Sequence, residues 1–217
     1  SDRYFRFYNK VIERVVQTKP DARIAVLGYG PCATPPEQTT IHDRICVFIT
    51  TGADPRQFEK AGGTSAIYQY HLDGAYPTIR HYPHMIARFL RESKAVGGLG
   101  YYAEIHHNWA AGGPKVYVLS HLLWDVNSDV DALLDRYMRL AFGEQATAPM
   151  RAYFDRWEAI WEREQALLAN PYDSIDNWKA NQLRKFRHVT WDDIRFMDAA
   201  LAIAKRARKT PRQKRRF

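Results

Sequence analysis

The stretch ARIAVLGYG, residues 22–30, is an almost uninterrupted apolar run bounded by proline, aspartate and glycine. A strand that is covered on both faces carries such a run, whereas a strand with one solvent face alternates apolar and polar residues. Three more short apolar runs follow it: RICVFIT at 44–50, AIYQYH at 66–71 and GLGYYAEI at 98–105. The sequence therefore predicts four strands of the kind found in parallel sheets.

The segments around these runs suit parallel pairing, because a parallel connection needs a crossover of a dozen or more residues. Apolar residues at helical spacing predict a helix over 4–16, before the first strand. A second helix is predicted over 83–95, with Pro83 in its first turn. The pattern favours a fold of alternating strands and helices.

After residue 115 the sequence shows no further strand and reads as helical. Helices are predicted over 114–125, over 128–143 with Ser128 and Asp131 at capping-box spacing, over 148–170, and from Thr190 onward.

A complete (β/α)8 barrel takes roughly 250 residues and needs eight strands to close. We therefore predict a partial (β/α)8 barrel of about four parallel strands followed by a C-terminal α-helical region. Residues 1–115 would form the second half of the barrel. Residues 116–217 would form the helical region packed on it, truncated at its end.

The charge distribution and the lengths of the apolar runs limit the kinds of partner that this protein could bind. The net charge is +8, but eight Lys or Arg and no acid lie between Lys205 and Arg216, so one segment accounts for the excess. We expect no nucleic-acid partner. Because no apolar run is long enough to span a bilayer, we also expect no membrane partner. Two cysteines, Cys32 and Cys46, cannot form a disulfide framework.

Functional side chains of parallel barrels gather where strands end and loops begin. In the fourth run the period of two places Gly98, Gly100, Tyr102 and Glu104 on one face, with His106 beyond. Acid–base catalysis at such a site commonly uses a pair of carboxyl groups. The predicted catalytic pair is Glu104 with Asp73, which follows the neighbouring strand.

Aromatic rings near such sites stack on the apolar faces of sugars. The predicted substrate-binding residues are Tyr29, Tyr70, His71, Tyr76, Tyr102, His106, Asn108 and Trp109.

Other interpretations stay open for several of these residues. Asp73 precedes Gly74 and is also typical of a simple turn. Glu104, His106, His107 and His71 could be assembled into a metal site, but they lack the HExxH spacing, so we predict no metal and no cofactor. Asp125 is interpreted as bracing a corner between helices.

Several segments, in this order, resemble a family of bacterial glycoside hydrolase-like proteins that carry a domain of unknown function. These segments are 2–30, GGLGYYAEIHHNW at 97–109, and YVLSHLLWDVNSDVDALLDRYMRLAFG at 117–143. That family is related to the barrels of α-glucuronidase and β-hexosaminidase. The resemblance implies secretion or a periplasmic location, a carbohydrate substrate, and an N-terminal barrel half that this chain lacks.

The leading prediction is a carbohydrate-active protein of glycoside hydrolase type that acts on a poly- or oligosaccharide. As a fragment without part of its catalytic apparatus, the chain alone is expected to be inactive. The alternative is a non-catalytic carbohydrate-binding or scaffold domain with a barrel fold.

Overall fold

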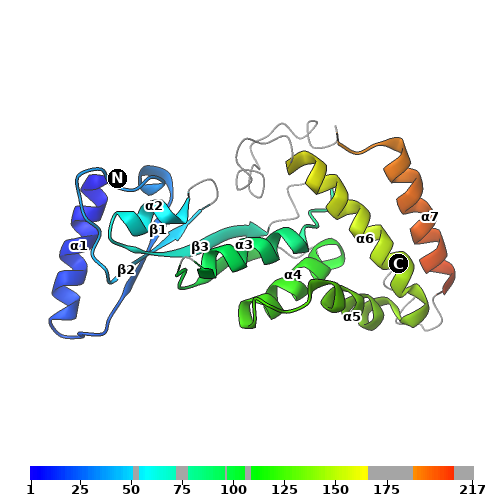
Figure 1. Cartoon of the computed structure of the whole chain (residues 1–217), viewed down its shortest axis with the longest axis horizontal. Helices are drawn as coiled ribbons and strands as arrows, with labels where there is room; N and C mark the ends of the chain where they lie inside the picture. Colours follow the sequence, from blue (N-terminus) through cyan, green and yellow to red (C-terminus); the bar gives the residue numbers. More distant parts are fainter. Residues whose placement is uncertain (51–53, 72–77, 96, 106–108, 166–187, 208–217) are drawn as a thin grey trace. The chain divides into compact units, whose positions relative to one another are not determined.

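The computed structural model describes residues 1–50, 54–71, 78–95, 97–105, 109–165 and 188–207 (Figure 1). The chain divides into two compact units, which we describe separately. The first unit comprises Ser1–Tyr70 and Arg91–Glu104, and the second comprises His71–Leu90 and Ile105–Phe217.

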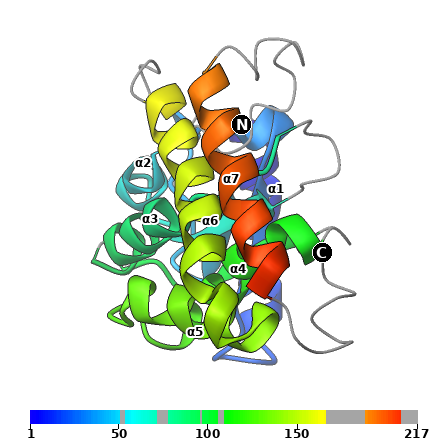
Figure 2. The same ribbon diagram turned by 90° about the vertical axis from the view of Figure 1, so that its right-hand side faces the viewer.

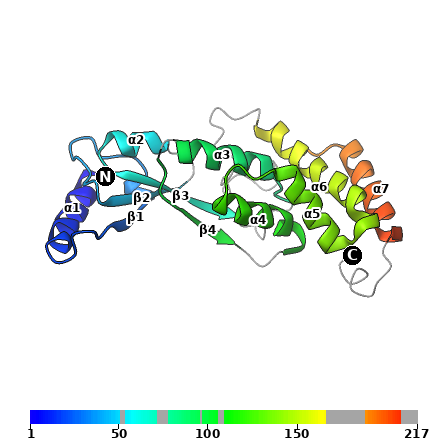
Figure 3. The same ribbon diagram turned by 60° about the horizontal axis from the view of Figure 1, so that its bottom comes forward.

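The first unit contains the sheet. Its elements are α1 (Asp2–Val16), β1 (Ile24–Gly28), the short 3-10 turn η1 (Gly30–Cys32), β2 (Ile45–Ile49), α2 (Pro55–Lys60), β3 (Thr64–His71) and β4 (Tyr101–Ile105). The strands lie in the order β1-β2-β3-β4, as Figure 3 shows.

All four strands are parallel and form a half-barrel, which confirms the predicted partial (β/α)8 barrel with a C-terminal helical region. The register pairs Val26 with Val47 and Phe48 with Ala66. Beside β3, the amide of Leu99 donates to the Ser65 carbonyl at 2.8 Å, and the amide of Ile67 donates to the Gly100 carbonyl at 3.0 Å.

The outer face of this sheet is covered by helices. Alternate residues of the strands, among them Val26, Val47 and Ile49, are buried in one cluster with Phe5 and Ile12 of α1. Both α1 side chains are fully buried, as the helical spacing of apolar residues requires. This cluster fixes which face of each strand points away from the helices.

The inner face carries the other alternate residues. Leu27, Phe48 and Ala66 lie side by side in the register, and a Cβ added at Gly100 would meet the Phe48 ring at 3.7 Å and the Ala66 Cβ at 3.8 Å. Leu27 is 51% exposed, so this face is open at β1. Tyr68, Tyr102 and Glu104 follow on the same face through the period of two.

The second unit is helical in its described part. It contains α4 (Trp109–Trp124), α5 (Val130–Phe142), α6 (Glu144–Gln165), α7 (Trp191–Ala207) and the first part of α3 (Pro83–Ala95). Helices α6 and α7 lie side by side (Figure 2). A second cluster, of Met138, Phe142, Ala146, Met150, Phe154 and Ala204, joins α5, α6 and α7.

Four local predictions were wrong. Helix α6 begins at Glu144, four residues before the predicted start at 148. Helix α2 was missed, although Asp54 caps it and Pro55 begins it. Helix α4 begins at Trp109, five residues before the predicted start at Pro114. Helix α5 is capped by Asp129, whose carboxylate accepts from the Ala132 amide at 3.1 Å, and not by Ser128.

Both cysteines are buried and free. The expectation for Asp125 is confirmed. Asp125 braces the turn after α4, because its carboxylate accepts from the Asn127 amide at 3.0 Å. The domain boundary predicted near residue 115 stays a prediction. Across the described residues, no helix combines the length and the apolar character that crossing a membrane requires.

Candidate functional site

Glu104 lies near the carboxyl end of β4 and is half-buried. The alternation of β4 puts it on the inner face with Tyr102, away from the helices that cover the outer face. In a parallel sheet the carboxyl ends of neighbouring strands lie at one edge. Glu104 therefore occupies the position at which barrel proteins present reactive side chains.

The Glu104 carboxylate is held by a tyrosine of the neighbouring strand. The phenol of Tyr68 on β3 donates a hydrogen bond to Oε1 of Glu104. Within the described residues, no hydrogen bond reaches Oε2. Among the described residues, Oε1 is thus held by Tyr68 and Oε2 has no hydrogen-bond partner.

Tyr68 remains protonated at any ordinary pH. Burial raises the pKa of Tyr68 well above its usual value, and hydrogen bonds to Glu104 and Tyr70 raise this pKa further. The phenol is therefore a permanent hydrogen-bond donor toward Glu104.

Three tyrosine rings surround this hydrogen bond. The rings of Tyr68 and Tyr102 are stacked, with centroids 5.0 Å apart and planes 16° from parallel. The ring of Tyr70 meets Tyr68 edge-on, with centroids 5.0 Å apart. Tyr68 is 7% exposed whereas Tyr102 is 55% exposed, so Tyr102 presents an aromatic surface next to Glu104.

The structure brings together three of the predicted site residues: Tyr70, Tyr102 and Glu104. Tyr29 follows β1, just before η1, and is 52% exposed. Trp109 begins α4 in the second unit and is 57% exposed.

The other predicted site residues cannot be placed. Asp73, Tyr76, His106 and Asn108 lie outside the described residues. His71 ends β3, and its side chain is likewise outside the description. The roles assigned to all these residues stay predictions.

Tyr68 is the one residue of this cluster that sequence reasoning missed. It precedes Tyr70 by two positions on β3, so the period of two already placed both rings on one face. The sequence AIYQYH carried this signal. The contact between Tyr68 and Glu104 depends on the register between β3 and β4, and the sequence alone does not predict that register.

A separate polar cluster lies inside the second unit. The side chains of Arg80, His81 and Lys115 are all essentially fully buried. The Lys115 ammonium lies 4.7 Å from the centre of the Tyr82 ring, a cation–π contact. Burial, followed by the charge of Lys115, lowers the pKa of His81 far below its usual value, so His81 is neutral.

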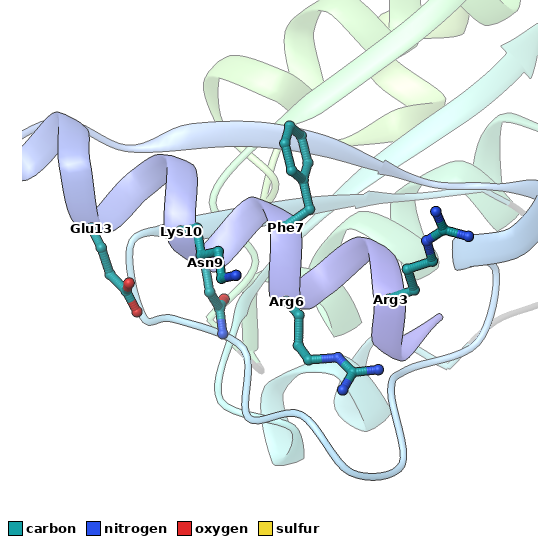
Figure 4. Close-up of a pocket in the computed structure, with 6 residues that line it drawn as sticks. All are labelled: Arg3, Arg6, Phe7, Asn9, Lys10 and Glu13. Carbon is teal, nitrogen blue, oxygen red and sulfur yellow. The ribbon is translucent and has the colours of Figure 1, made fainter.

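A pocket of about 560 Å³ lies along α1 (Figure 4). It is lined by Arg3, Arg6, Phe7, Asn9, Lys10 and Glu13. Asn9 is tied to the adjoining loop, because its amide donates to the Thr40 carbonyl at 2.8 Å. Helix α1 covers the outer face of the sheet, so this pocket is separate from the Glu104 cluster.

Nowhere in the described part of the chain do three His, Cys, Asp or Glu side chains gather in a way that could hold a metal ion. The metal alternative considered above involves His106 and His107, which fall outside that part.

The chain matches a family described as Domain of unknown function (DUF4838) over residues 1–74 and 64–155. The chain belongs to this family. Neither a curated protein nor a solved structure matches the chain. The description of the DUF4838 family assigns no activity to its members.

Proposed function

We propose that this DUF4838 chain belongs to a carbohydrate-active protein of glycoside hydrolase type and that its sugar lies against Tyr102 and Glu104. The single observation that carries the proposal is the arrangement of Tyr68, Tyr102 and Glu104 on the inner face. It combines an anchored carboxylate with an exposed aromatic ring.

These two groups supply complementary contacts to a sugar. A pyranose ring has an apolar face of C–H groups that stacks on an aromatic ring, and its hydroxyl groups donate hydrogen bonds to a carboxylate. Tyr102 is backed by Tyr68, so its ring is held rigid for stacking. Oε2 of Glu104 then accepts from a hydroxyl group of the same sugar.

Hydrolysis requires a second carboxyl group about 5–5.5 Å away in a retaining enzyme or about 6.5–9.5 Å away in an inverting one. Asp73, which follows β3, is the proposed second carboxyl of this chain. Glu104 would be the base or nucleophile, and the acid would be Asp73 or a residue of the N-terminal barrel half.

The proposal includes that further barrel half as a partner of this sheet. Strands β1 and β4 are the two edges of the sheet, so each has a neighbouring strand on one side only within the described part of the chain. The unpaired backbone N–H and C=O groups of such edges favour pairing with additional strands. Four more β/α units would cover these edges and close a barrel.

The second candidate function is a non-catalytic carbohydrate-binding domain. It is favoured by the fact that Glu104 is the only Asp or Glu within the four described strands. A carbohydrate-binding domain needs the Tyr102 ring and Oε2 of Glu104 as contacts to the sugar, but it needs no second carboxyl group to protonate a leaving oxygen.

Replacing Glu104 by Gln tests both candidates, because the amide keeps the shape and removes the charge. The variant is compared with the unchanged protein for hydrolysis of 4-nitrophenyl glycosides, with and without the upstream barrel half, and for binding of neutral, amino and uronic-acid oligosaccharides. Loss of turnover with retained binding supports the hydrolase. Turnover and binding that are both unchanged would remove Glu104 from the site.

A further inference from the structure

We propose that Tyr68 is a positioning residue that holds Oε1 of Glu104 and thereby directs Oε2 toward the sugar. This inference rests on the proposed function and adds a residue that acts through Glu104 without touching the sugar itself.

The first step of the argument is that Tyr68 is fixed. Its ring is almost completely buried, one neighbour stacks on it and another meets it edge-on. Tyr68 also belongs to β3, which has a strand on each side. A phenol confined in this way points its hydroxyl group in one direction.

The second step is that Glu104 depends on this phenol. A glutamate side chain has several rotatable bonds, and reactive groups must be held within about 0.5 Å of their working position. The hydrogen bond from Tyr68 is the one anchor of the Glu104 carboxylate in the described part of the chain. Without it, the carboxylate would sample other rotamers.

The third step concerns the kind of contact that Glu104 makes. Because Tyr68 donates to Oε1, that oxygen is engaged as an acceptor, and Oε2 is the oxygen left for a contact with the sugar among the described residues. Oε2 is then oriented to accept from a sugar hydroxyl group or from water. The arrangement suits a carboxyl group that contacts the sugar through one defined oxygen.

The test is Tyr68→Phe, which keeps the ring and its contacts and removes only the hydroxyl group. Tyr102→Phe is the matched control, since it makes the same change on the stacked neighbour. Thermal unfolding of both variants first establishes that they fold.

Two readouts follow. Carbodiimide with glycinamide labels free carboxyl groups, and the labelling rate of Glu104 is measured by peptide mass spectrometry. We expect Tyr68→Phe to raise this rate by roughly threefold or more and to weaken oligosaccharide binding by about tenfold, as loss of a hydrogen bond to a charged group implies. Tyr102→Phe should change the labelling rate little.

The outcomes separate this inference from the proposed function. If Glu104→Gln leaves both turnover and oligosaccharide binding unchanged, the proposed function fails, while the labelling rate of Glu104 in the Tyr68→Phe variant still reports whether Tyr68 holds Glu104. If Glu104→Gln weakens binding but Tyr68→Phe changes neither the labelling rate of Glu104 nor oligosaccharide binding relative to the unchanged protein, the role of Tyr68 alone is overturned.

Discussion

Replacing Asp193 by Ala should destabilise the second unit more than any other single change at the start of α7. The Asp193 carboxylate is 1% exposed and accepts from the amide and the hydroxyl group of Thr190, each at 2.8 Å. It also pairs with Arg156 at 3.3 Å and with Arg163 at 2.5 Å, both on α6. One side chain thus caps α7 and joins it to α6.

The magnitude follows from these contacts. Losing the hydrogen bonds at the helix start costs about 1 kcal/mol. Removing one partner of a buried ion pair costs roughly 3–5 kcal/mol, but here water can reach the arginines, which are 32% and 42% exposed, so about 2 kcal/mol is reasonable. We therefore expect the free energy of unfolding to fall by about 3 kcal/mol in total.

The assay is urea unfolding followed by helical circular dichroism, with Asp192→Ala as the control. Asp192 is the preceding residue of α7, is 88% exposed and pairs with Arg195 at 3.1 Å. Its removal should cost less than about 1 kcal/mol. Equal losses for the two variants would refute the argument that burial and shared contacts make Asp193 important.

The pH dependence of the same side chain has a definite sign. Burial by itself raises the pKa of Asp193, yet the hydrogen bonds from Thr190 and the charge of Arg163 bring it below its ordinary value. A depressed pKa contributes stability above the unfolded value of about 3.9, and the contribution is lost as the pH falls through the folded value. The difference between Asp193→Asn and the unchanged protein should therefore shrink below about pH 4.

Two further predictions concern other parts of the fold. The hydrogen bond to Glu158 raises the pKa of His84, so the stability that this pair provides should be present below about pH 6.5 and lost as the pH rises through the folded pKa. The difference in melting temperature between the unchanged protein and His84→Gln should therefore narrow as the pH rises. A difference that stays constant with pH would contradict a stabilising role of the pair. Gly62 has φ of +102°, and an added Cβ would lie 2.6 Å from the Ile41 carbonyl oxygen, so Gly62→Ala should cost about 1–3 kcal/mol in urea unfolding. Gly97 has φ of +88°, but a Cβ added there would meet no atom within 4 Å, so Gly97→Ala should lower the free energy of unfolding less than Gly62→Ala does. Similar losses at both positions would mean that the contact between the added Cβ and the Ile41 carbonyl oxygen is unimportant.

The elements with strong local signals were predictable from sequence. Helix α3 has the predicted bounds, because Pro83 begins it and apolar residues recur at helical spacing. Strands β1 and β2 lie within a residue or two of their apolar runs for the same reason. Helix α2 has six residues, too few for a periodic pattern, although Asp54 before Pro55 was a usable start signal.

Contacts between distant segments could not be predicted. Ser128 and Asp129 are both good capping residues, and Asp131, expected to complete a capping box, instead pairs with Arg151 of α6. The same limit applied to the site, because the hydrogen bond between Tyr68 and Glu104 spans 36 positions and depends on strand register. Sequence placed Glu104 at a strand end, and packing supplied its partner.

The central claim is that a sugar contacts the tyrosine and glutamate cluster on the inner face. The most direct measurement is an NMR titration of the protein with ring-labelled tyrosine, in which neutral, amino and uronic-acid oligosaccharides are added in turn. The account predicts that one of them shifts the resonances of Tyr102 and Tyr68 and that Glu104→Gln weakens the response. Shifts confined to Tyr4, on α1, or no shift with any oligosaccharide, would contradict it.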